Sequence, residues 1–371
     1  MSVNKIITNI IKFIQSKNKK ILLQKIFQRT VLAIITPKKY KKLPKNYHVE
    51  ISTHCNLQCE YCMLKVNNTK PELMSFEKFK EHIAPYLKYA HCVGLSGLAE
   101  PLLNKDFFKF VEHINSINKN CCISIFTNAL LLNEKTSEKL VEAKLDQLLF
   151  SIDTPDQELN DKIRKGSDLN KIIQNIKKLQ EIKQANKAEQ PYIYATTVLQ
   201  KKNYQHLPDL IQLLSDLKIN KLFVNSLEPY QKDNLPEILF LPSDRPADLD
   251  QVINKAQKLA EEKNIDLKIA SQTALPASCD PGTPFILPNG DITVCAVLAY
   301  ARDYFFTVDK SLTVYKDQGK TTPVIFGNIF QQDFEKIWFD DKYQDFREKV
   351  RNNNFPPECQ ACLIKHNIIC A

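Results

Sequence analysis

From residue 47 onward, the sequence alternates short runs of β-branched or aromatic residues with longer segments of helical periodicity, and this alternation repeats six times. Two of the helical segments, 75–90 and 168–184, begin with the capping residues Ser75 and Asp168. Six successive strand–helix units predict an α/β fold with a parallel sheet and crossover helices. The expected strands are residues 47–52, 92–96, 122–128, 147–153, 192–199 and 221–227.

The loops that follow the first four expected strands contain residues with chemical or conformational roles, among them three cysteines and one of the seven glycines of the chain. In parallel sheets of this kind the carboxyl ends of the strands form one rim, and the loops at that rim carry the chemistry. We therefore expect side chains from the four loops to meet there. These loops are residues 53–62, 96–101, 127–129 and 151–153.

Three cysteines, Cys55, Cys59 and Cys62, lie within eight positions of the first loop. Such a loop can bind three thiolates to one face of a cubane iron–sulfur cluster. The fourth iron then has no protein ligand and stays open to a substrate or cofactor, as the open position does in a catalytic zinc site. A zinc site completed by His54 is the alternative interpretation.

With Tyr61 directly before the last cysteine, the loop has the pattern C-x3-C-x-aromatic-C and resembles that of the radical S-adenosylmethionine (SAM) superfamily. The resemblance covers about residues 47–228. It implies a partial (β/α)6 TIM-like barrel, a 4Fe-4S cluster bound by the three cysteines, and SAM as the second cofactor. In this family the cluster cleaves SAM reductively, and the resulting 5′-deoxyadenosyl radical abstracts a hydrogen atom from the substrate.

The second loop also resembles that family. Segment 96–101, "SGLAEP", is similar to its Gly-Gly-Glu-Pro stretch, which implies that Gly97 and Glu100 hold the amino group of SAM. By the same resemblance, Tyr61 is expected beside the adenine.

Three more positions match the family in the later loops. Ser151 and Arg164 resemble the polar pair that meets the carboxylate and ribose of SAM. Asn128 is a further candidate for a SAM contact.

A second module is expected at the end of the chain. Asn289 and Gly290 lie between two apolar runs in segment 284–295, which predicts a β-hairpin with a type I′ turn, and segment 333–350 is expected to form one helix. The module also holds five cysteines, Cys279, Cys295, Cys359, Cys362 and Cys370.

The spacing of these cysteines resembles the C-terminal extension called SPASM, or its shorter twitch form. The resemblance implies one auxiliary 4Fe-4S cluster bound by Cys279, Cys295, Cys359 and Cys362, with Cys370 as a substitute ligand or an unliganded thiol. A structural zinc site is the alternative, because zinc ribbons also combine hairpin and knuckle cysteines.

Positive charge is concentrated at the start of the chain. Residues 1–45 hold twelve Lys or Arg and no Asp or Glu, so subtracting this arm from the net charge of +9 leaves −3 for the rest. Apolar residues at helical spacing predict two short basic amphipathic helices that end near Pro37. We expect the arm to pack on the body; peripheral contact with an anionic membrane surface or an acidic partner is the alternative.

No apolar run approaches the ~18 residues of a membrane-spanning helix, and no secretory signal is apparent. We therefore expect a cytoplasmic protein. In that reducing compartment the eleven cysteines favour metal or cluster binding over a disulfide framework.

Together the two resemblances imply a radical SAM oxidoreductase or maturase that acts on a peptide or protein side chain. A small-molecule dehydrogenase or epimerase, for example one acting on a sugar, and a non-catalytic zinc-stabilised binding protein are the alternatives. The resemblance implies a reductant such as flavodoxin or ferredoxin, and no nucleic-acid partner is expected. The expected parts are an arm (1–45), a barrel core (46–230), a linker and helix (231–270) and a cluster-binding module (271–371).

Overall fold

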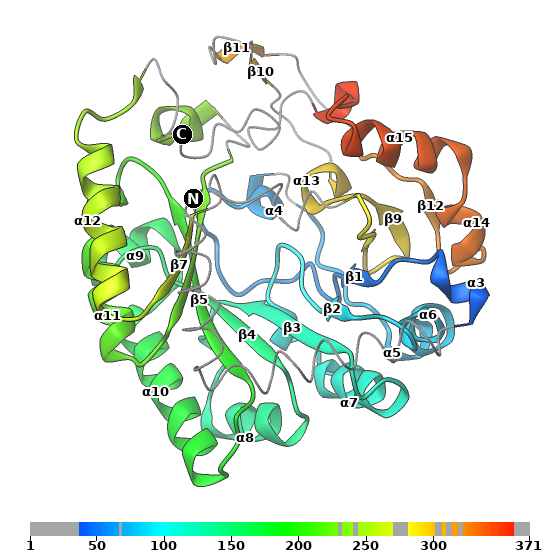
Figure 1. Ribbon diagram of the computed structural model, residues 1–371, viewed down its shortest axis with the longest axis horizontal. Coiled ribbons are helices and arrows are strands. Elements are labelled where there is room, and N and C mark those ends of the chain that lie inside the picture. The colour runs from blue at the N-terminus through cyan, green and yellow to red at the C-terminus, as the bar shows by residue number, and fades with distance from the viewer. Residues whose placement is uncertain are drawn as a thin grey trace, which may run out of the picture.

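One curved sheet organises the chain. The computed structural model describes residues 37–66, 69–228, 232–239, 244–269, 281–300, 306–308, 314–317 and 322–359. Its ten-stranded sheet has the order β12-β9-β8-β1-β2-β3-β4-β5-β6-β7. Figure 1 shows the strands curving around a common centre with helices on the outside, which confirms the predicted α/β class and partial barrel.

The first seven strands are parallel and adjacent in chain order. They are β1 (Asn46–Val49), β2 (Cys92–Gly94), β3 (Cys122–Thr127), β4 (Gln147–Ser151), β5 (Tyr192–Leu199), β6 (Lys221–Ser226) and β7 (Asp266–Ile269). Six of them are the strands expected from the sequence. The seventh, β7, pairs with β6 and lies within the segment that we expected to contain only a linker and a helix.

The outer helices bury one apolar stripe each against this sheet. In α10 (Leu169–Ala185) the buried residues recur at helical spacing, and the Asp168 side chain accepts a hydrogen bond from the Lys171 N–H at 3.0 Å, as expected for its N-cap. The other helices of this layer are α7 (Phe107–Ile117), α8 (Glu134–Glu142), α9 (Gln157–Ile163), α11 (Leu207–Asp216) and α12 (Leu249–Glu262).

The helix expected over residues 75–90 is interrupted. Its turns are α5 (Phe76–Lys78), a π-helical turn η1 (Phe79–Ile83) and α6 (Ala84–Leu87). Pro85 explains the irregularity, because it has no N–H to donate to the preceding turn. The amphipathic pattern is nevertheless satisfied, since Phe79, Ile83 and Leu87 are buried.

The C-terminal module continues the barrel sheet. Strand β8 (Phe285–Ile286) pairs parallel with β1, and β9 (Asp291–Thr293) and β12 (Gly327–Asn328) follow as antiparallel strands. The predicted hairpin is present, but a type I′ turn is wrong, because that turn needs positive φ at both central residues. The Gly290 N–H donates to Leu287 O at 2.9 Å, so Pro288 and Asn289 are the two central residues of the turn. Neither of them has positive φ; Gly290, which follows them, has a φ of +91°.

Two helices replace the single one expected over residues 333–350. They are α14 (Phe334–Trp338) and α15 (Asp341–Arg351), and Asp340 caps the second by accepting from the N–H groups of Lys342 and Tyr343. Other short elements are α3 (Lys38–Lys41), α4 (Met63–Val66), α13 (Ala296–Ala299) and the antiparallel pair β10 (Phe306–Val308) and β11 (Val314–Asp317).

Several expectations fall outside the described residues. They are the two basic helices of the arm before Pro37, and the positions of Cys279, Cys362 and Cys370. Within the described part of the chain, no helix combines the length and the apolar character needed to cross a membrane.

Candidate active site

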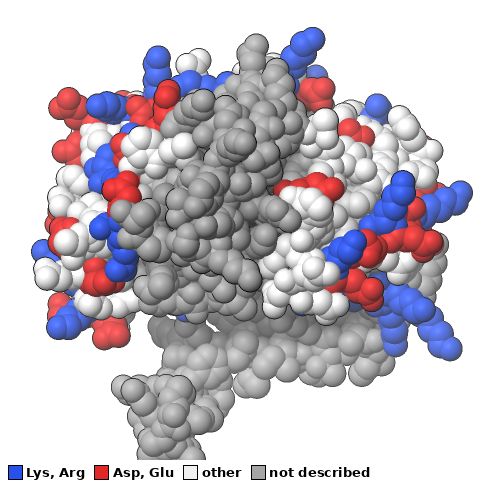
Figure 2. Space-filling model, turned by 90° about the horizontal axis from the view of Figure 1, so that it is seen from above, with Lys and Arg blue, Asp and Glu red and all other residues white. Residues whose placement is uncertain are grey.

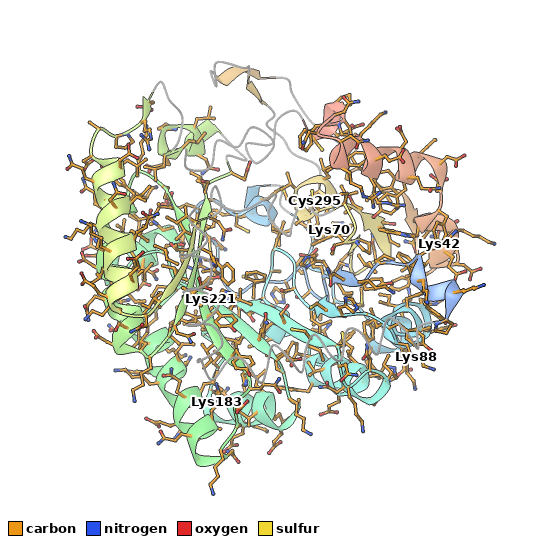
Figure 3. The ribbon with its side chains drawn as sticks, viewed as in Figure 1. Lys42, Lys70, Lys88, Lys183, Lys221 and Cys295 are labelled. Atoms are coloured by element: carbon orange, nitrogen blue, oxygen red, sulfur yellow. The ribbon has the colours of Figure 1, made fainter. Side chains whose placement is uncertain are left out.

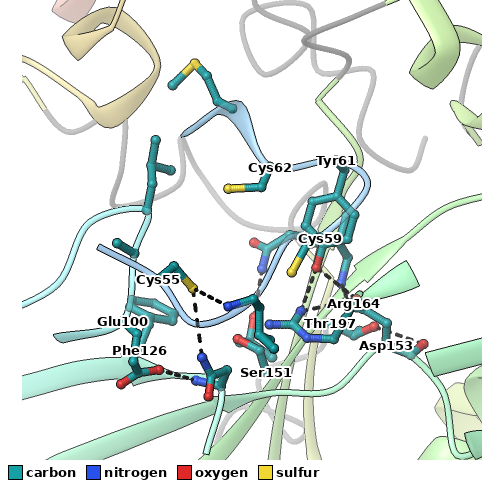
Figure 4. Close-up of a pocket in the computed structure, with 18 of the residues that line it drawn as sticks. Cys55, Cys59, Tyr61, Cys62, Glu100, Phe126, Ser151, Asp153, Arg164 and Thr197 are labelled. Carbon is teal, nitrogen blue, oxygen red and sulfur yellow. Dashed lines mark hydrogen bonds and ion pairs between the residues drawn. The ribbon is translucent and has the colours of Figure 1, made fainter. Parts of the chain in front are cut away.

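A cavity of about 330 Å³ opens at the carboxyl ends of the barrel strands. Figure 4 shows the three cysteine side chains of the first loop on one side of it and the ends of β3 to β5 on the other. Every candidate from the barrel lines this cavity: Cys55, Cys59, Tyr61, Cys62, Gly97, Glu100, Asn128, Ser151 and Arg164. The structure therefore brings together residues that are up to about a hundred positions apart.

The cysteine loop is held against the turn that follows α9. The backbone N–H of Gln58 donates to Lys165 O at 2.8 Å, and that of Glu60 donates to Ile163 O at 2.9 Å. Gly166 has a φ of +93° and packs on Leu57. These contacts fix the path of the loop between β1 and α4.

The thiols of this loop lie in a low-dielectric environment. Burial raises the pKa of Cys59 to about 11, although the Arg164 guanidinium lowers it in part. Burial also raises the pKa of Cys55. Because thiolates are the metal-binding form, these groups need a cationic partner to ionise here, and an iron–sulfur cluster provides one.

The donor set fits a cluster better than a single ion. Among the described residues, no three His, Cys, Asp or Glu side chains lie close enough together to bind one metal ion. Zinc needs its ligands to converge on one point, whereas a cubane binds each thiolate at a separate iron.

Glu100 joins the loop after β2 to the end of β3. Its buried carboxylate accepts hydrogen bonds from Thr127 Oγ1 at 3.0 Å, Asn128 N at 2.8 Å and Leu102 N at 3.2 Å. Burial raises its pKa to about 7, and these hydrogen bonds lower it in part. The Asn128 side chain in turn donates to Asn56 Oδ1 at 2.8 Å, and lies 4.0 Å from Cys55 Sγ.

A buried group of three side chains lies on the other side of the cysteine loop. The Tyr61 hydroxyl donates to Asp153 Oδ2 at 2.8 Å and accepts from Arg164 at 2.6 Å, while Arg164 pairs with the same carboxylate oxygen at 3.2 Å. Burial and the Asp153 charge raise the pKa of Tyr61. Arg164 Nε is buried and has no hydrogen-bond partner among the described residues.

The unpaired Arg164 nitrogen supports a cavity built for a polar ligand. An unsatisfied buried donor costs roughly 1–3 kcal/mol, so a ligand acceptor at this position would be stabilised. Ser226 Oγ, at the β6 end of the cavity, is likewise buried and unpartnered within the described chain. The residues present therefore fit both a thiolate-bound cluster and a charged organic cofactor.

Some cavity residues were not among the candidates. Asp153 lies in the loop between β4 and α9, Phe126 on β3 is 40% exposed, and Thr197 lies on β5. The rule that chemistry lies at the carboxyl ends of parallel strands could have found all three. Residues of β6, namely Asn225 and Ser226, lie at the same level.

Glu50 was also missed, and it explains Gly97. The Glu50 carboxylate is fully buried, and Oε1 accepts a hydrogen bond from Leu98 N at 2.7 Å. A Cβ atom at position 97 would overlap this carboxylate. The glycine is therefore required by the close approach of the Glu50 side chain, which directly follows β1.

We expect Gly97→Ala to destabilise the protein by about 1–3 kcal/mol, the usual range for overpacking. Urea unfolding followed by circular dichroism measures the change. Because the clash is with one side chain, Glu50→Ala in the same chain should relieve part of it, giving a double-mutant cycle that is not additive. Additive effects of the two substitutions would contradict this explanation.

Cys295 and Cys359 pack against one apolar cluster in the C-terminal module. Cys295 directly precedes α13, beside which it is labelled in Figure 3, and Cys359 ends the short helix η8 (Pro357–Cys359). Both pack against the same apolar cluster of Leu298, Phe346 and Val350. Two of the five candidate cysteines of the module thus lie on one surface.

Comparisons with known proteins give two family matches. Residues 49–214 match the radical SAM superfamily, and residues 280–363 match SPASM, an iron–sulfur cluster-binding domain. The first match covers the cysteine loop and strands β2 to β5; the second covers the hairpin, Cys295 and Cys359.

Proteins similar to this chain include one matched by its sequence and two matched by their solved structures. The chain is 23% identical over 329 residues to the tungsten-containing aldehyde ferredoxin oxidoreductase cofactor-modifying protein of Pyrococcus furiosus, covering 86% of this chain and 88% of that protein. The structure of Streptococcus suis SuiB bound to precursor peptide SuiA aligns with a TM-score of 0.60 and 18% identity, over 94% of this chain and 75% of the other. The anSMEcpe structure with bound AdoMet and Cp18Cys peptide aligns with a TM-score of 0.60 and 17% identity, over 86% of this chain and 88% of the other.

Proposed function

Because this chain belongs to the radical SAM superfamily of enzymes and carries a SPASM-type domain, we propose that it is a maturase that modifies a peptide or protein side chain. The family implies a 4Fe-4S cluster and SAM, and the SPASM domain implies auxiliary iron–sulfur binding. The observation that carries the proposal is the single cavity that gathers three thiols, the loop after β2 and the buried Arg164.

We assign the cluster to Cys55, Cys59 and Cys62, which line the cavity from one loop. When bound, the cluster supplies the electron for reductive cleavage of SAM, the chemistry by which this superfamily abstracts a hydrogen atom from its substrate. Tyr61 and Asp153 fix the Arg164 guanidinium by hydrogen bonds, so that its free Nε is available to an acceptor on SAM.

The remaining candidates would orient SAM from the strand ends. Gly97 and Glu100 border the cavity on the side of β2, and Asn128 and Ser151 border it at β3 and β4. With the hydrogen bonds of Glu100 already satisfied within the protein, this residue also holds the loop in shape. Glu100 and Asn128 are buried, which would limit the access of water to SAM on this side of the cavity.

In the C-terminal module we assign Cys279, Cys295, Cys359 and Cys362 to an auxiliary 4Fe-4S cluster, with Cys370 as a substitute or free thiol. The common apolar cluster under Cys295 and Cys359 supports this assignment. The SPASM match over residues 280–363 includes three of the four proposed ligands and starts one residue after the other, Cys279.

Peptide substrates are favoured by the solved structures of similar fold, since SuiB was solved with a precursor peptide and anSMEcpe with a Cp18Cys peptide. A second candidate is a small molecule or cofactor, because the relative from Pyrococcus furiosus is named for modifying the cofactor of an oxidoreductase. Acidic and basic side chains are interspersed on the described part of the face in Figure 2, which does not favour nucleic acid. We further propose a flavodoxin- or ferredoxin-type reductant and a cytoplasmic location, where cysteines stay reduced.

The substrate class can be tested by isotope transfer. The anaerobically reconstituted enzyme is incubated with SAM, dithionite and a perdeuterated cell lysate separated into macromolecular and low-mass fractions. We expect deuterium in 5′-deoxyadenosine only with the macromolecular fraction, and loss of this transfer after protease treatment. Transfer from the low-mass fraction alone would support the second candidate instead.

A further inference from the structure

A buried carboxylate joins the C-terminal module to the loop after β2. Glu50 follows β1, and its backbone N–H donates to Ile286 O of β8 at 2.8 Å. Its side chain is fully buried: Oε1 accepts from Leu98 N at 2.7 Å, and Oε2 accepts from the hydroxyl of Tyr300. One residue thus contacts β8, the loop that contains Gly97, and the end of α13.

Tyr300 places the module in this contact. It directly follows α13, and Cys295 directly precedes that helix, so one helical turn separates the two residues. Burial raises the pKa of Tyr300 far above its ordinary range, so its hydroxyl remains a donor at physiological pH. Burial raises the pKa of Glu50 to about 7, and the hydrogen bonds from Tyr300 and Leu98 oppose that shift.

We propose that Glu50 and Tyr300 are positioning residues, through which the C-terminal module fixes the loop 96–101 in the shape that binds SAM. The inference rests on the proposed role of Gly97 and Glu100 in SAM binding. Its physical basis is that Leu98 N has its hydrogen bond to a carboxylate that itself depends on Tyr300. Without the Tyr300 hydroxyl the buried carboxylate loses a hydrogen-bond donor. Because an unsatisfied buried carboxylate is costly, we expect it to move away from the loop.

Hydrogen exchange tests this link without turnover. In the reconstituted full-length protein, Tyr300→Phe and Glu50→Leu should speed exchange of peptides covering residues 96–101 by about tenfold or more, the equivalent of one lost hydrogen bond to a charged group. The same variants should weaken SAM binding by about tenfold in equilibrium dialysis. Glu50→Gln should keep both the exchange rate of these peptides and the SAM affinity near their wild-type values, because its amide can accept from Leu98 N and donate to the Tyr300 oxygen.

Tyr343→Phe is the matched control. Tyr343 lies in the same module, and its hydroxyl donates to Thr293 O at 3.2 Å, a buried contact that involves neither Glu50 nor Leu98. We expect this variant to leave exchange at 96–101 and SAM affinity unchanged. Equal effects of Tyr343→Phe and Tyr300→Phe, or no effect of Tyr300→Phe, would overturn the inference.

Failure of the two proposals can be told apart. A wild-type protein that does not bind SAM contradicts the proposed function, whereas wild-type SAM binding that Tyr300→Phe leaves intact contradicts only this inference. Should Glu50→Leu not fold, Tyr300→Phe and Glu50→Gln still decide the outcome, since each preserves the packing volume.

Discussion

Cys59→Ala is expected to abolish SAM cleavage. Cys59 is the most buried of the three loop thiols, and its replacement leaves two, Cys55 and Cys62, to hold a cluster. Reconstituted protein should lose about four iron atoms per chain relative to wild type, and 5′-deoxyadenosine should fall to the level without enzyme. Iron analysis and chromatography of the products measure the two effects.

The control for this substitution is Cys121→Ala. Cys121 is a buried thiol in the main core, and it directly precedes β3 at the end of that strand that lies away from the cavity. Its replacement therefore removes a thiol without changing the site. It should keep its iron and its 5′-deoxyadenosine formation. Wild-type SAM cleavage by Cys59→Ala would mean that the cluster is bound elsewhere.

Arg164→Met is expected to have the largest effect on stability. The pair between Arg164 and Asp153 is almost completely buried, with 8% and 0% of the side chains exposed. Removing one member of such a pair leaves a charge without compensation and typically costs about 3–5 kcal/mol. Asp153 keeps hydrogen bonds from Tyr61 and Val198 N, which places the expected cost near the lower end.

Anaerobic urea unfolding followed by circular dichroism tests this prediction. The double variant Arg164→Met, Asp153→Asn removes both charges, and should recover part of the lost free energy of unfolding. Lys178→Met, which breaks the exposed pair with Glu134, should leave the unfolding midpoint unchanged. A midpoint for Arg164→Met equal to that of Lys178→Met would show that the buried pair does not stabilise the site.

The sequence predicts the parallel sheet well because its signal is repeated. Strands β3, β4 and β5 are rich in β-branched, aromatic and other apolar residues, and helices with clear caps such as Asp168 separate them. Each unit supports the interpretation of the next. Strand β7 gives no such signal. It is four residues long at the sheet edge and includes the exposed Asp266 and Lys268, so its pairing depends on β6 rather than on its own composition.

Local deviations were missed where a single residue overrides the pattern. Asn289-Gly290 favours a type I′ turn, but Pro288 before them fixes a different turn, with positive φ at Gly290 only. The apolar spacing continues across Phe339 and Asp340, yet Asp340 starts a new helix by capping it. Both outcomes depend on backbone geometry that periodicity does not describe.

Around the cavity, the residues of the motifs could be predicted from the sequence, but the residues that hold them in place by hydrogen bonds could not. The three cysteines and Arg164 follow from a resemblance, and all of them line one cavity. Glu50 belongs to no motif, and a carboxylate within the expected strand 47–52 is typical of a residue that faces solvent. Only the three-dimensional contacts with Leu98 and Tyr300 identify it.

The central claim is that the three thiols hold a cluster with one iron open to SAM. Electron–nuclear double resonance on the dithionite-reduced, anaerobically reconstituted enzyme tests this directly, with SAM labelled by ¹⁵N in its amino group. We predict a hyperfine coupling between the labelled nitrogen and the reduced cluster, absent in Cys59→Ala. A cluster signal that does not change when SAM is added, or colourless protein that contains zinc, would contradict the claim.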